Sequence, residues 1–380
     1  MTLEPPVPAE VLARIRAPFL GTGAALADAP VIQPLGLLLD LAGEAMRARL
    51  FVVQGEGGEE ACLRPDFTIP LARLHLASGE GDGRYVYEGK AFRVAPQGSD
   101  RAQEFLQIGL EAYGAGDAPV VDAEIAGLAW TAAAAGGRSD LSLMMGDVAL
   151  FSAFVDALGL PPGLGQRLKR AFSRPGALQA ELERARSGAP PPRQGDRLAA
   201  LLGGLPEAEA SAVLEDLWAL AGIQPVGGRS AAEIAHRLTE RAAAAGEPGL
   251  SAAQADLVTR FLAISDRPRA GLAKAARIAL EAGADIDGAL EAWSRRLAAL
   301  ISQGAPEARL TLATAFGRAF GYYDGFLFEV RSVALGEARP VAGGGRYDSL
   351  PLRMGGADFG GAVGCMVRPA RAWAGAERAS

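Results

Sequence analysis

Alternation of apolar and polar residues between turn-forming residues dominates the chain from about residue 50 to residue 150. Such period-two runs, bounded by small and polar residues, are typical of β-strands. They predict strands at 51–54, 85–94, 104–113 and 141–145. The second and third strands are expected to be joined by a loop at 95–103. An Ala-rich segment at 122–135 has the length of a helix and ends at two glycines, which commonly terminate helices.

The pattern changes between about residues 151 and 305, where Ala, Leu, Arg and Glu predominate. Prolines interrupt this region at 161–163 and 189–195, which favours several short helices over one long helix. Two sequences match the capping box of a helix start: Ser230-x-x-Glu233 and Ser251-x-x-Gln254. Strand patterns return after residue 309. We expect these strands at 309–315, 322–330 and 361–367, with a Gly-rich turn at 342–345.

The simplest architecture for these elements is an α+β fold, in which helices flank an antiparallel sheet and a helical segment is inserted before the last strands. A chain of 380 residues is too long for one ordinary compact core, which agrees with such a division. We therefore expect the first part of the sheet domain at 1–150, a helical insertion at 151–305 and the last part of the sheet domain at 306–380.

The predicted strand at 104–113 has an unusual second face. One face carries Leu106, Ile108, Leu110 and Ala112 and should pack into the core. The opposite face places Gly109 between Gln107 and Glu111, which stand about 13 Å apart at roughly 3.4 Å per residue. This span suits a ligand of the size of histidine lying along the strand. The alternative is a solvated face, which is common in antiparallel sheets.

Composition narrows the functional classes. The formal charge is −6, from 38 Lys and Arg against 44 Asp and Glu, and no run of basic residues forms the dense positive face of a nucleic-acid-binding protein. The only cysteines, Cys62 and Cys365, lie in apolar segments and suit neither a disulfide framework nor a zinc site, so buried free thiols are expected. The N-terminus is unlike a signal peptide, and no apolar stretch of about twenty residues exists to span a bilayer. We expect a cytoplasmic protein.

Several segments, taken in order, resemble the catalytic core of class II aminoacyl-tRNA synthetases, and in particular histidyl-tRNA synthetase. LRPDFTIPLAR at 63–73 resembles an LRPE-x-T segment, and RAFGYYDGFLFE at 318–329 resembles the histidine-specific RGLDYYTG-x-VFE signature. Residues 85–93 and 104–111 resemble motif 2, and AGGGRYD at 342–348 resembles the glycine turn that follows the signature. The resemblance covers about 60–135 and 310–370, and it implies the fold of that family.

The resemblance also assigns roles to individual residues. Asp66 and Thr68 are expected to hold the α-amino group of histidine with the help of Gln107, because a carboxylate gains a charge-assisted hydrogen bond to an ammonium. Glu111 and Tyr323 are expected to contact the two imidazole nitrogens, which would select histidine over other flat side chains.

Three further residues match positions of the family. Arg318 matches the arginine that faces the amino acid carboxylate and the reacting phosphate, and Tyr322 completes a tyrosine pair in the expected histidine site. Arg93 matches the motif 2 arginine on the α-phosphate and is a candidate for a residual phosphate or nucleotide contact. The alternatives are a surface arginine, a tyrosine pair in the core and a hairpin turn at 324–325. Neither a catalytic residue nor a metal ligand is assigned.

Other positions depart from the synthetase pattern. Ala95 stands where the family has an acidic residue near the adenine, and Gly321 replaces the usual aspartate of the signature. The arginine of motif 3, which grips the γ-phosphate, normally follows Gly-Leu-Glu, whereas this chain has RPAR at 368–371. The chain ends nine residues after Arg371, where an anticodon-binding domain would need on the order of a hundred more residues, so we expect no such domain.

One paralogue group of the synthetases resembles this combination, namely the regulatory subunits of ATP phosphoribosyltransferase. This resemblance implies a non-catalytic protein without a cofactor that binds L-histidine and mediates feedback on the first step of histidine biosynthesis. The implied partner is a short catalytic ATP phosphoribosyltransferase subunit, with self-dimerisation inside a hetero-oligomer. Two alternatives remain open: a synthetase-like enzyme that forms histidyl-adenylate, and a tRNA-binding paralogue, against which the negative charge argues.

Overall fold

The computed structural model describes residues 4–55, 58, 60–172, 175–187, 205–221, 249–317 and 321–375. The chain divides into two compact units. The first consists of Met1–Phe154, Phe261–Glu281 and Asp285–Ser380, and the second of Val155–Arg260 and Ala282–Ala284. The division at residues 150 and 305 that the sequence suggests stays a prediction. Among the described residues, no helix combines the length and the apolar character needed to cross a membrane.

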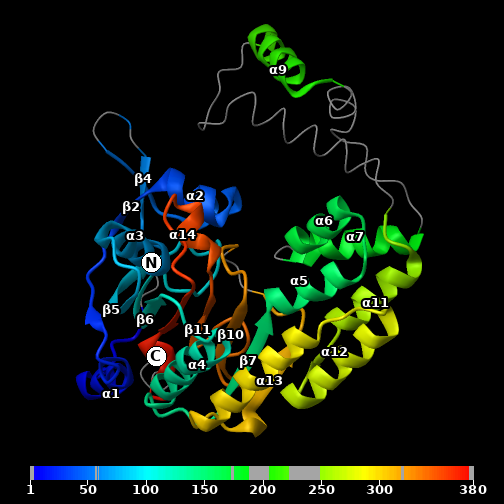
Figure 1. Ribbon diagram of the computed structural model, residues 1–380. Coiled ribbons are helices and arrows are strands. Elements are labelled where there is room, and N and C mark those ends of the chain that lie inside the picture. Colours follow the sequence, from blue (N-terminus) through cyan, green and yellow to red (C-terminus); the bar gives the residue numbers. More distant parts are fainter. Residues whose placement is uncertain are drawn as a thin grey trace. The chain divides into compact units, whose positions relative to one another are not determined.

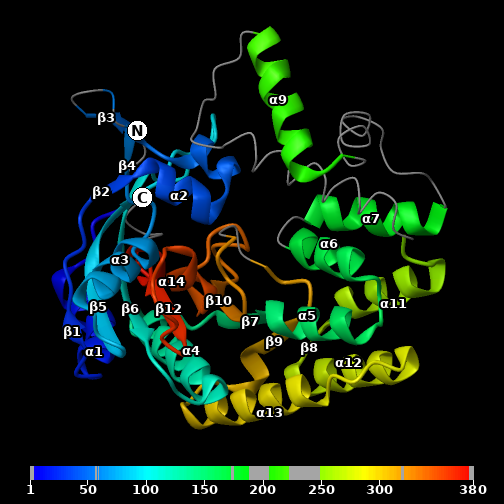
Figure 2. The same cartoon turned by 45° about the horizontal axis from the view of Figure 1, so that its top comes forward.

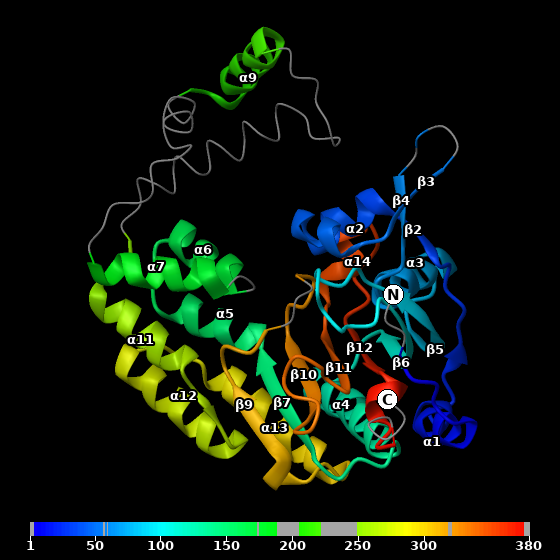
Figure 3. The same ribbon diagram turned by 180° about the vertical axis from the view of Figure 1, so that it is seen from behind.

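A nine-stranded, mostly antiparallel sheet forms the centre of the first unit (Figure 3). Its strand order is β1-β5-β6-β12-β11-β10-β7-β9-β8, with parallel pairs only at β1/β5 and β7/β9. The strands are β1 Ala25–Leu26, β5 Gly83–Phe92, β6 Glu104–Tyr113, β7 Leu141–Asp147, β8 Ser265–Asp266, β9 Leu310–Ala313, β10 Phe326–Ser332, β11 Ala342–Arg346 and β12 Ala362–Val367. A small second sheet joins β2 Ile32–Pro34, β4 Glu60–Leu63 and β3 Val52–Gln54.

Helices cover both faces of the large sheet. On one face α4 (Ala118–Ala134) packs on β10, β11 and β12, while α1 (Ala9–Leu20) and α13 (Asp287–Ser302) lie against α4 (Figure 1). On the other face α14 (Ser349–Arg353) lies beside α3 (Thr68–Ser78), as Figure 2 shows. There α2 (Leu35–Ala42) and the 3₁₀ helix η1 (Glu44–Arg49) join them in one apolar cluster. The unit also contains α12 (Pro268–Ala282) except for its last residue, the 3₁₀ helix η2 (Glu307–Arg309) and α15 (Pro369–Ala372).

The second unit is helical where it is described. Its elements are α6 (Pro162–Phe172), α7 (Pro175–Ser187), α9 (Glu207–Ala221) and most of α11 (Ala252–Leu262), and α5 (Val148–Ala157) leads into it from the first unit. The capping box at the start of α11 is confirmed. The amide of Gln254 donates to Ser251 Oγ at 3.2 Å, and the amide of Ser251 donates to Gln254 Oε1 at 3.0 Å. The second predicted box, Ser230 with Glu233, lies outside the described residues.

Most predicted strands are confirmed within a few residues, but the segment at 342–345 is not the predicted turn. It forms β11, a completely buried strand between β10 and β12. A Cβ atom at Gly344 would lie 2.1 Å from the carbonyl oxygen of Gly364, and one at Gly345 would lie 2.7 Å from that of Phe326. Glycine is therefore required here for the close approach of backbones rather than for a turn.

This crowding makes the centre of the sheet sensitive to a single methyl group. We expect Gly344→Ala to lower the free energy of unfolding by about 2–3 kcal/mol or more, because the colliding atoms belong to the backbone and cannot rotate away. The matched control is Gly288→Ala in α13, where no atom lies within 4 Å of the added carbon. That variant should match the wild type or gain up to about 1 kcal/mol. Equal denaturation midpoints for both variants would contradict this packing.

Candidate functional site

A recess opens on the face of the sheet that carries α3 and α14. The space within it that the centre of a water-sized sphere can reach is about 20 Å³, enough for about one water molecule, so a larger ligand requires the lining side chains to move apart. The lining residues are Asp66, Thr68, Tyr87, Arg93, Gln107, Glu111, Tyr322, Tyr323, Gly343, Gly364, Cys365 and Met366. The structure thus brings together all the predicted site residues except Arg318, which lies outside the described residues.

Glycines form the floor of this recess. Register places Glu111 of β6 directly opposite Gly364 of β12, and Gly109 opposite Met366. A Cβ atom at Gly364 would overlap Glu111 Oε2 at 1.5 Å, so the absence of a side chain creates the space in which the carboxylate lies. At Gly109 a Cβ atom would instead meet the Tyr87 hydroxyl at 2.4 Å. The polar face predicted for residues 104–113 is therefore not solvated: Gln107 and Glu111 are each 1% exposed.

Glu111 is an acid in the recess whose pKa is strongly perturbed. Thr68 donates to its Oε1 atom at 2.9 Å and the Tyr347 hydroxyl donates to Oε2 at 2.5 Å. Burial nevertheless raises the pKa of Glu111 to about 8, because the loss of hydration outweighs these two hydrogen bonds and the nearby Asp66 charge adds to it. The pKa of Glu111 is thus close to neutral pH, and when the carboxyl is protonated one of the two hydroxyl groups accepts its proton instead of donating.

Asp66 and Gln107 carry buried polar atoms without partners. The Tyr322 hydroxyl donates to Asp66 Oδ2 at 3.1 Å, and the amides of Thr68 and Ile69 lie close enough to the carboxylate to lower its pKa, but Asp66 Oδ1 has no partner in good hydrogen-bond geometry among the described residues. The same holds for both Oε1 and Nε2 of Gln107. Burial raises the pKa of Asp66, while Arg93 opposes that rise. Since buried polar groups are rarely left unpaired in native proteins, these three atoms are candidates for hydrogen bonds with water or with a polar ligand.

The tyrosine pair reaches the recess from a loop and not from a strand. The predicted strand at 322–330 begins only at Phe326, which leaves Tyr322 and Tyr323 before β10. Asp324 fixes this loop, since its carboxylate accepts hydrogen bonds from the amides of Asp348 at 3.0 Å and Ser349 at 2.7 Å. The two tyrosine rings lie 4.7 Å apart, and Tyr322 is 2% exposed.

Two tyrosines at the site were missed by the sequence reasoning. Tyr87 stacks on Phe67 with ring centroids 4.3 Å apart, and its hydroxyl donates to the Cys365 carbonyl at 3.2 Å. Tyr347, which contacts Glu111, follows the glycines of β11. The signal for Tyr87 was present, because the hairpin of two predicted strands places it opposite Gly109. Both cysteines are buried free thiols, as predicted.

Arg93 stands at the end of the recess. Its Nε donates to the Pro65 carbonyl at 2.8 Å, and its guanidinium lies 5.3 Å from the centre of the Phe105 ring. Burial lowers the pKa of Arg93 to about 10, and the Asp66 carboxylate acts in the opposite direction. Among the described residues, no cluster of three or more His, Cys, Asp or Glu side chains could hold a metal ion.

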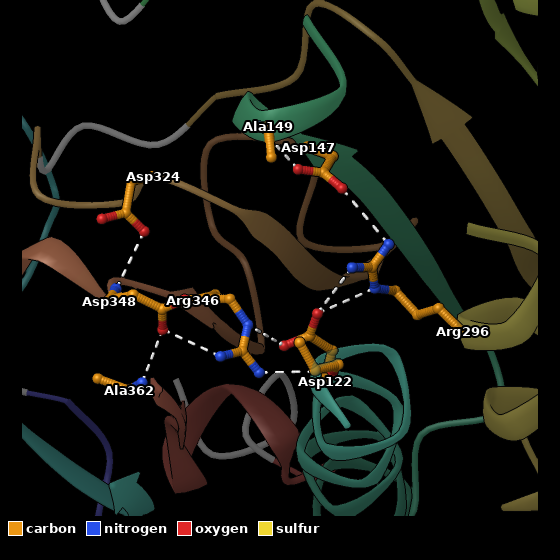
Figure 4. A network of polar contacts seen from close by, with 9 residues as sticks. Asp122, Asp147, Ala149, Arg296, Asp324, Arg346, Asp348 and Ala362 are labelled. Atoms are coloured by element: carbon orange, nitrogen blue, oxygen red, sulfur yellow. Dashed lines mark hydrogen bonds and ion pairs between the residues drawn. The ribbon is translucent and has the colours of Figure 1, made fainter. Parts of the chain in front are cut away.

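A buried network of ion pairs supports the strand and loop that carry the tyrosines (Figure 4). Asp122 of α4 is completely buried and accepts from Arg346 Nε at 2.8 Å and from Arg296 Nη2 at 2.8 Å. Arg346 also donates to Asp348 at 2.9 Å, and Arg296 donates to Asp147 at 3.4 Å. The network thus fixes the residues on both sides of Tyr347.

Comparison with known proteins agrees with this geometry. The histidyl-tRNA synthetase family model matches residues 9–226 and 210–369. A solved structure described as an ATP phosphoribosyltransferase regulatory subunit/histidyl-tRNA synthetase from Bacillus halodurans aligns with 96% of this chain and 78% of its own, with a TM-score of 0.61 and 19% identity. The fold is therefore that of the class II aminoacyl-tRNA synthetase core, as predicted.

Sequence relatives narrow the assignment. The chain is 38% identical over 344 residues to an ATP phosphoribosyltransferase regulatory subunit of Agrobacterium fabrum, which covers 89% of both proteins. It is 36% identical over 337 residues to the corresponding protein of Brucella anthropi, with 87% of this chain and 88% of the relative covered. The chain belongs to the family of ATP phosphoribosyltransferase regulatory subunits, which is built on the histidyl-tRNA synthetase fold.

The ion-pair network provides a direct test of what supports the site. We expect Asp122→Asn to lower the free energy of unfolding by about 3–5 kcal/mol, because it leaves two buried guanidinium groups without their shared carboxylate. The control is Asp117→Asn, whose partner Arg295 is half exposed and whose loss should cost less than about 1 kcal/mol. Similar denaturation curves for the two variants would show that the network contributes little.

Proposed function

We propose that this regulatory subunit senses free L-histidine in the recess and transmits its presence to a separate catalytic subunit. The carrying observation is the set of buried, unpartnered atoms of Asp66 and Gln107, which lie in one recess with Glu111. Each buried polar atom without a hydrogen-bond partner costs about 1–3 kcal/mol in the free protein. A ligand that forms hydrogen bonds with these atoms removes that cost, which favours its binding. That set fits an amino acid with a polar side chain.

Histidine matches the recess at both ends. Its ammonium group would donate to Asp66 Oδ1 and to Gln107 Oε1, while Thr68 stays near the same end. Its imidazole would pair with Glu111 and Tyr323, which line the same recess. Arg318 would face the ligand carboxylate, and Tyr322 would keep Asp66 oriented. Arg93 is the proposed residual contact for a phosphate group.

Regulation needs more than a bound ligand. Histidine can change the activity of a complex only when it binds two states of that complex with different affinities. We propose a short catalytic ATP phosphoribosyltransferase subunit as the partner, with this chain self-dimerising inside the hetero-oligomer and bringing neither cofactor nor catalytic residue. The complex would work in the cytoplasm, where the two free thiols stay reduced.

Histidine binding should depend on pH in a way that identifies Glu111. Below about pH 8 Glu111 is protonated in the free protein, and above about pH 6.5 the imidazole of free histidine is neutral. Between these two pH values the two groups together carry one proton, which is the number that their hydrogen bond in the complex needs. Affinity should be flat in this window. Above the window histidine binding requires the uptake of a proton, so the affinity should fall by up to about tenfold per pH unit. Below the window binding requires the release of a proton, and the affinity should fall by a similar factor as the pH decreases. Calorimetric titration across pH measures this profile.

Two substitutions at Glu111 test whether its titrating carboxyl group causes this pH dependence of histidine binding. Glu111→Gln should abolish the loss that begins near pH 8, because an amide does not titrate, while the loss at low pH remains. Glu111→Ala should weaken binding at neutral pH by about 2–3 kcal/mol. Wild-type affinity for Glu111→Ala would place the histidine site elsewhere.

The regulatory role is tested with the partner itself. This chain should co-purify with a short ATP phosphoribosyltransferase subunit, and the transferase activity of the complex should change when histidine is added. The catalytic subunit should lose that response when it is assayed with Glu111→Ala, although the complex still assembles. Histidine-dependent exchange between ATP and pyrophosphate by this chain alone would instead support a synthetase-like enzyme, and a salt-sensitive tRNA complex would support RNA binding.

A further inference from the structure

A second cavity lies on the α4 face of the sheet, where β6 ends and β5 and β12 begin. The space within it that the centre of a water-sized sphere can reach is about 240 Å³, against about 20 Å³ for the recess on the other face. One water molecule needs roughly 10–15 Å³ by the same measure. The floor, to which Ala112, Val363 and Arg346 contribute, is buried. This cavity therefore admits a small molecule without any movement of its lining side chains.

Missing side chains create this space. Gly114, Gly116 and Gly361 line the cavity. A Cβ atom at Gly361 would lie 2.9 Å from the carbonyl oxygen of Gly114 and 3.0 Å from Arg346 Nη1. One at Gly114 would overlap the Asp82 carboxylate, and the φ angle of Gly114, +122°, is one that other residues rarely adopt. Glycines thus keep open a space that larger residues would fill.

The walls of the cavity carry charges of both signs. Asp82 and Glu124 are acidic, while Arg84 and Arg346 are basic, so the formal charges of the lining residues sum to zero. Arg346 is already engaged in the ion-pair network of Figure 4 and serves as part of the floor. A ligand that carries one charge of each sign leaves this balance unchanged, whereas a simple anion or cation does not.

Two of these charged side chains have unused hydrogen-bonding capacity. Arg84 Nη2 donates to Glu124 Oε1, but Arg84 Nε is buried without a hydrogen-bond partner among the described residues. In the same part of the chain, no hydrogen bond or ion pair engages the Asp82 carboxylate. Asp82 and Arg84 flank Gly83 at the start of β5, so their Cα atoms are about 7 Å apart along the strand. The cavity thus presents a free anion and a partly free cation side by side.

We propose that this cavity binds a free α-amino acid with a short apolar side chain, whose carboxylate pairs with Arg84 and whose ammonium group pairs with Asp82. Both are charge-assisted hydrogen bonds, and an α-amino acid carries the two groups on one carbon. Val121 and Val363 provide apolar contact for the side chain of the ligand. This site lies on the opposite face of the sheet from the recess, and it does not depend on the proposed histidine sensing.

Three related molecules test which groups the cavity recognises. Calorimetric titration of the full chain with L-valine should show a Kd of about 1 mM or tighter. Isovalerate lacks the ammonium group and isobutylamine lacks the carboxylate, so each should bind on the order of tenfold more weakly or less. L-Alanine and L-leucine extend the titration to smaller and larger side chains. Absence of binding by L-valine, L-alanine and L-leucine up to about 10 mM would overturn the proposal.

Substitutions of the two charged residues locate the site. Arg84→Gln should weaken L-valine binding on the order of tenfold and remove the preference for L-valine over isobutylamine. Asp82→Asn should remove the preference for L-valine over isovalerate. Asp82 is exposed and the ion pair of Arg84 is partly exposed, so both variants should keep the fold. The control is Arg277→Gln, at an exposed position on α12, which should bind as the wild type does. Equal L-valine affinities for Arg84→Gln and Arg277→Gln would overturn the proposal.

A variant of the recess separates this cavity from the proposed histidine site. Glu111→Ala should bind L-valine with the affinity of the wild type, because Glu111 lies on the other face of β6. Arg84→Gln should likewise bind histidine as the wild type does. Loss of L-valine binding in Glu111→Ala would place the amino acid in the recess and contradict a second site.

Discussion

The close approach of glycine-bearing strands beneath a buried carboxylate is the constraint on which the site depends. Glu111 can be almost fully buried only because Gly364, directly opposite on β12, has no side chain. The neighbouring β11 contributes three consecutive glycines and can pair tightly with β12 on one side and β10 on the other. A bulkier sheet would close the recess, and a more open one would hydrate Glu111 and lower its pKa toward that of an ordinary carboxylate.

Ion pairing on the opposite face of the sheet gives the site its rigidity. Arg346 points away from the recess to Asp122, while the next residue, Tyr347, points into it toward Glu111. Two consecutive residues at the end of β11 therefore connect a buried charge network to the hydroxyl that contacts Glu111. Asp324 does the same for the tyrosine pair through the amides of Asp348 and Ser349. The positions of the side chains that line the recess are thus supported by contacts that lie outside it.

The sequence was informative where its pattern is local. Alternation along 104–113 identifies both faces of β6, and the ordered motifs are sufficient to place Asp66, Gln107 and Glu111 together. The pattern failed at β11, because a run of glycines has no hydrophobic alternation and resembles a turn. It also failed at Tyr322, where the strand is replaced by a loop whose shape is set by hydrogen bonds to residues more than twenty positions away. The hydrogen bond from Arg368 to Glu4, which are 364 residues apart in sequence, leaves no local signal at all.

Asp66 interacts both with Tyr322 in the recess and with Arg93 beside it. Its carboxylate accepts from Tyr322 on the side of the recess, and it also acts on the buried Arg93, whose charge in turn acts on Arg371. An ammonium group bound to Asp66 would offset the negative charge that now compensates Arg93, so occupancy of the recess would change the electrostatic environment of that arginine.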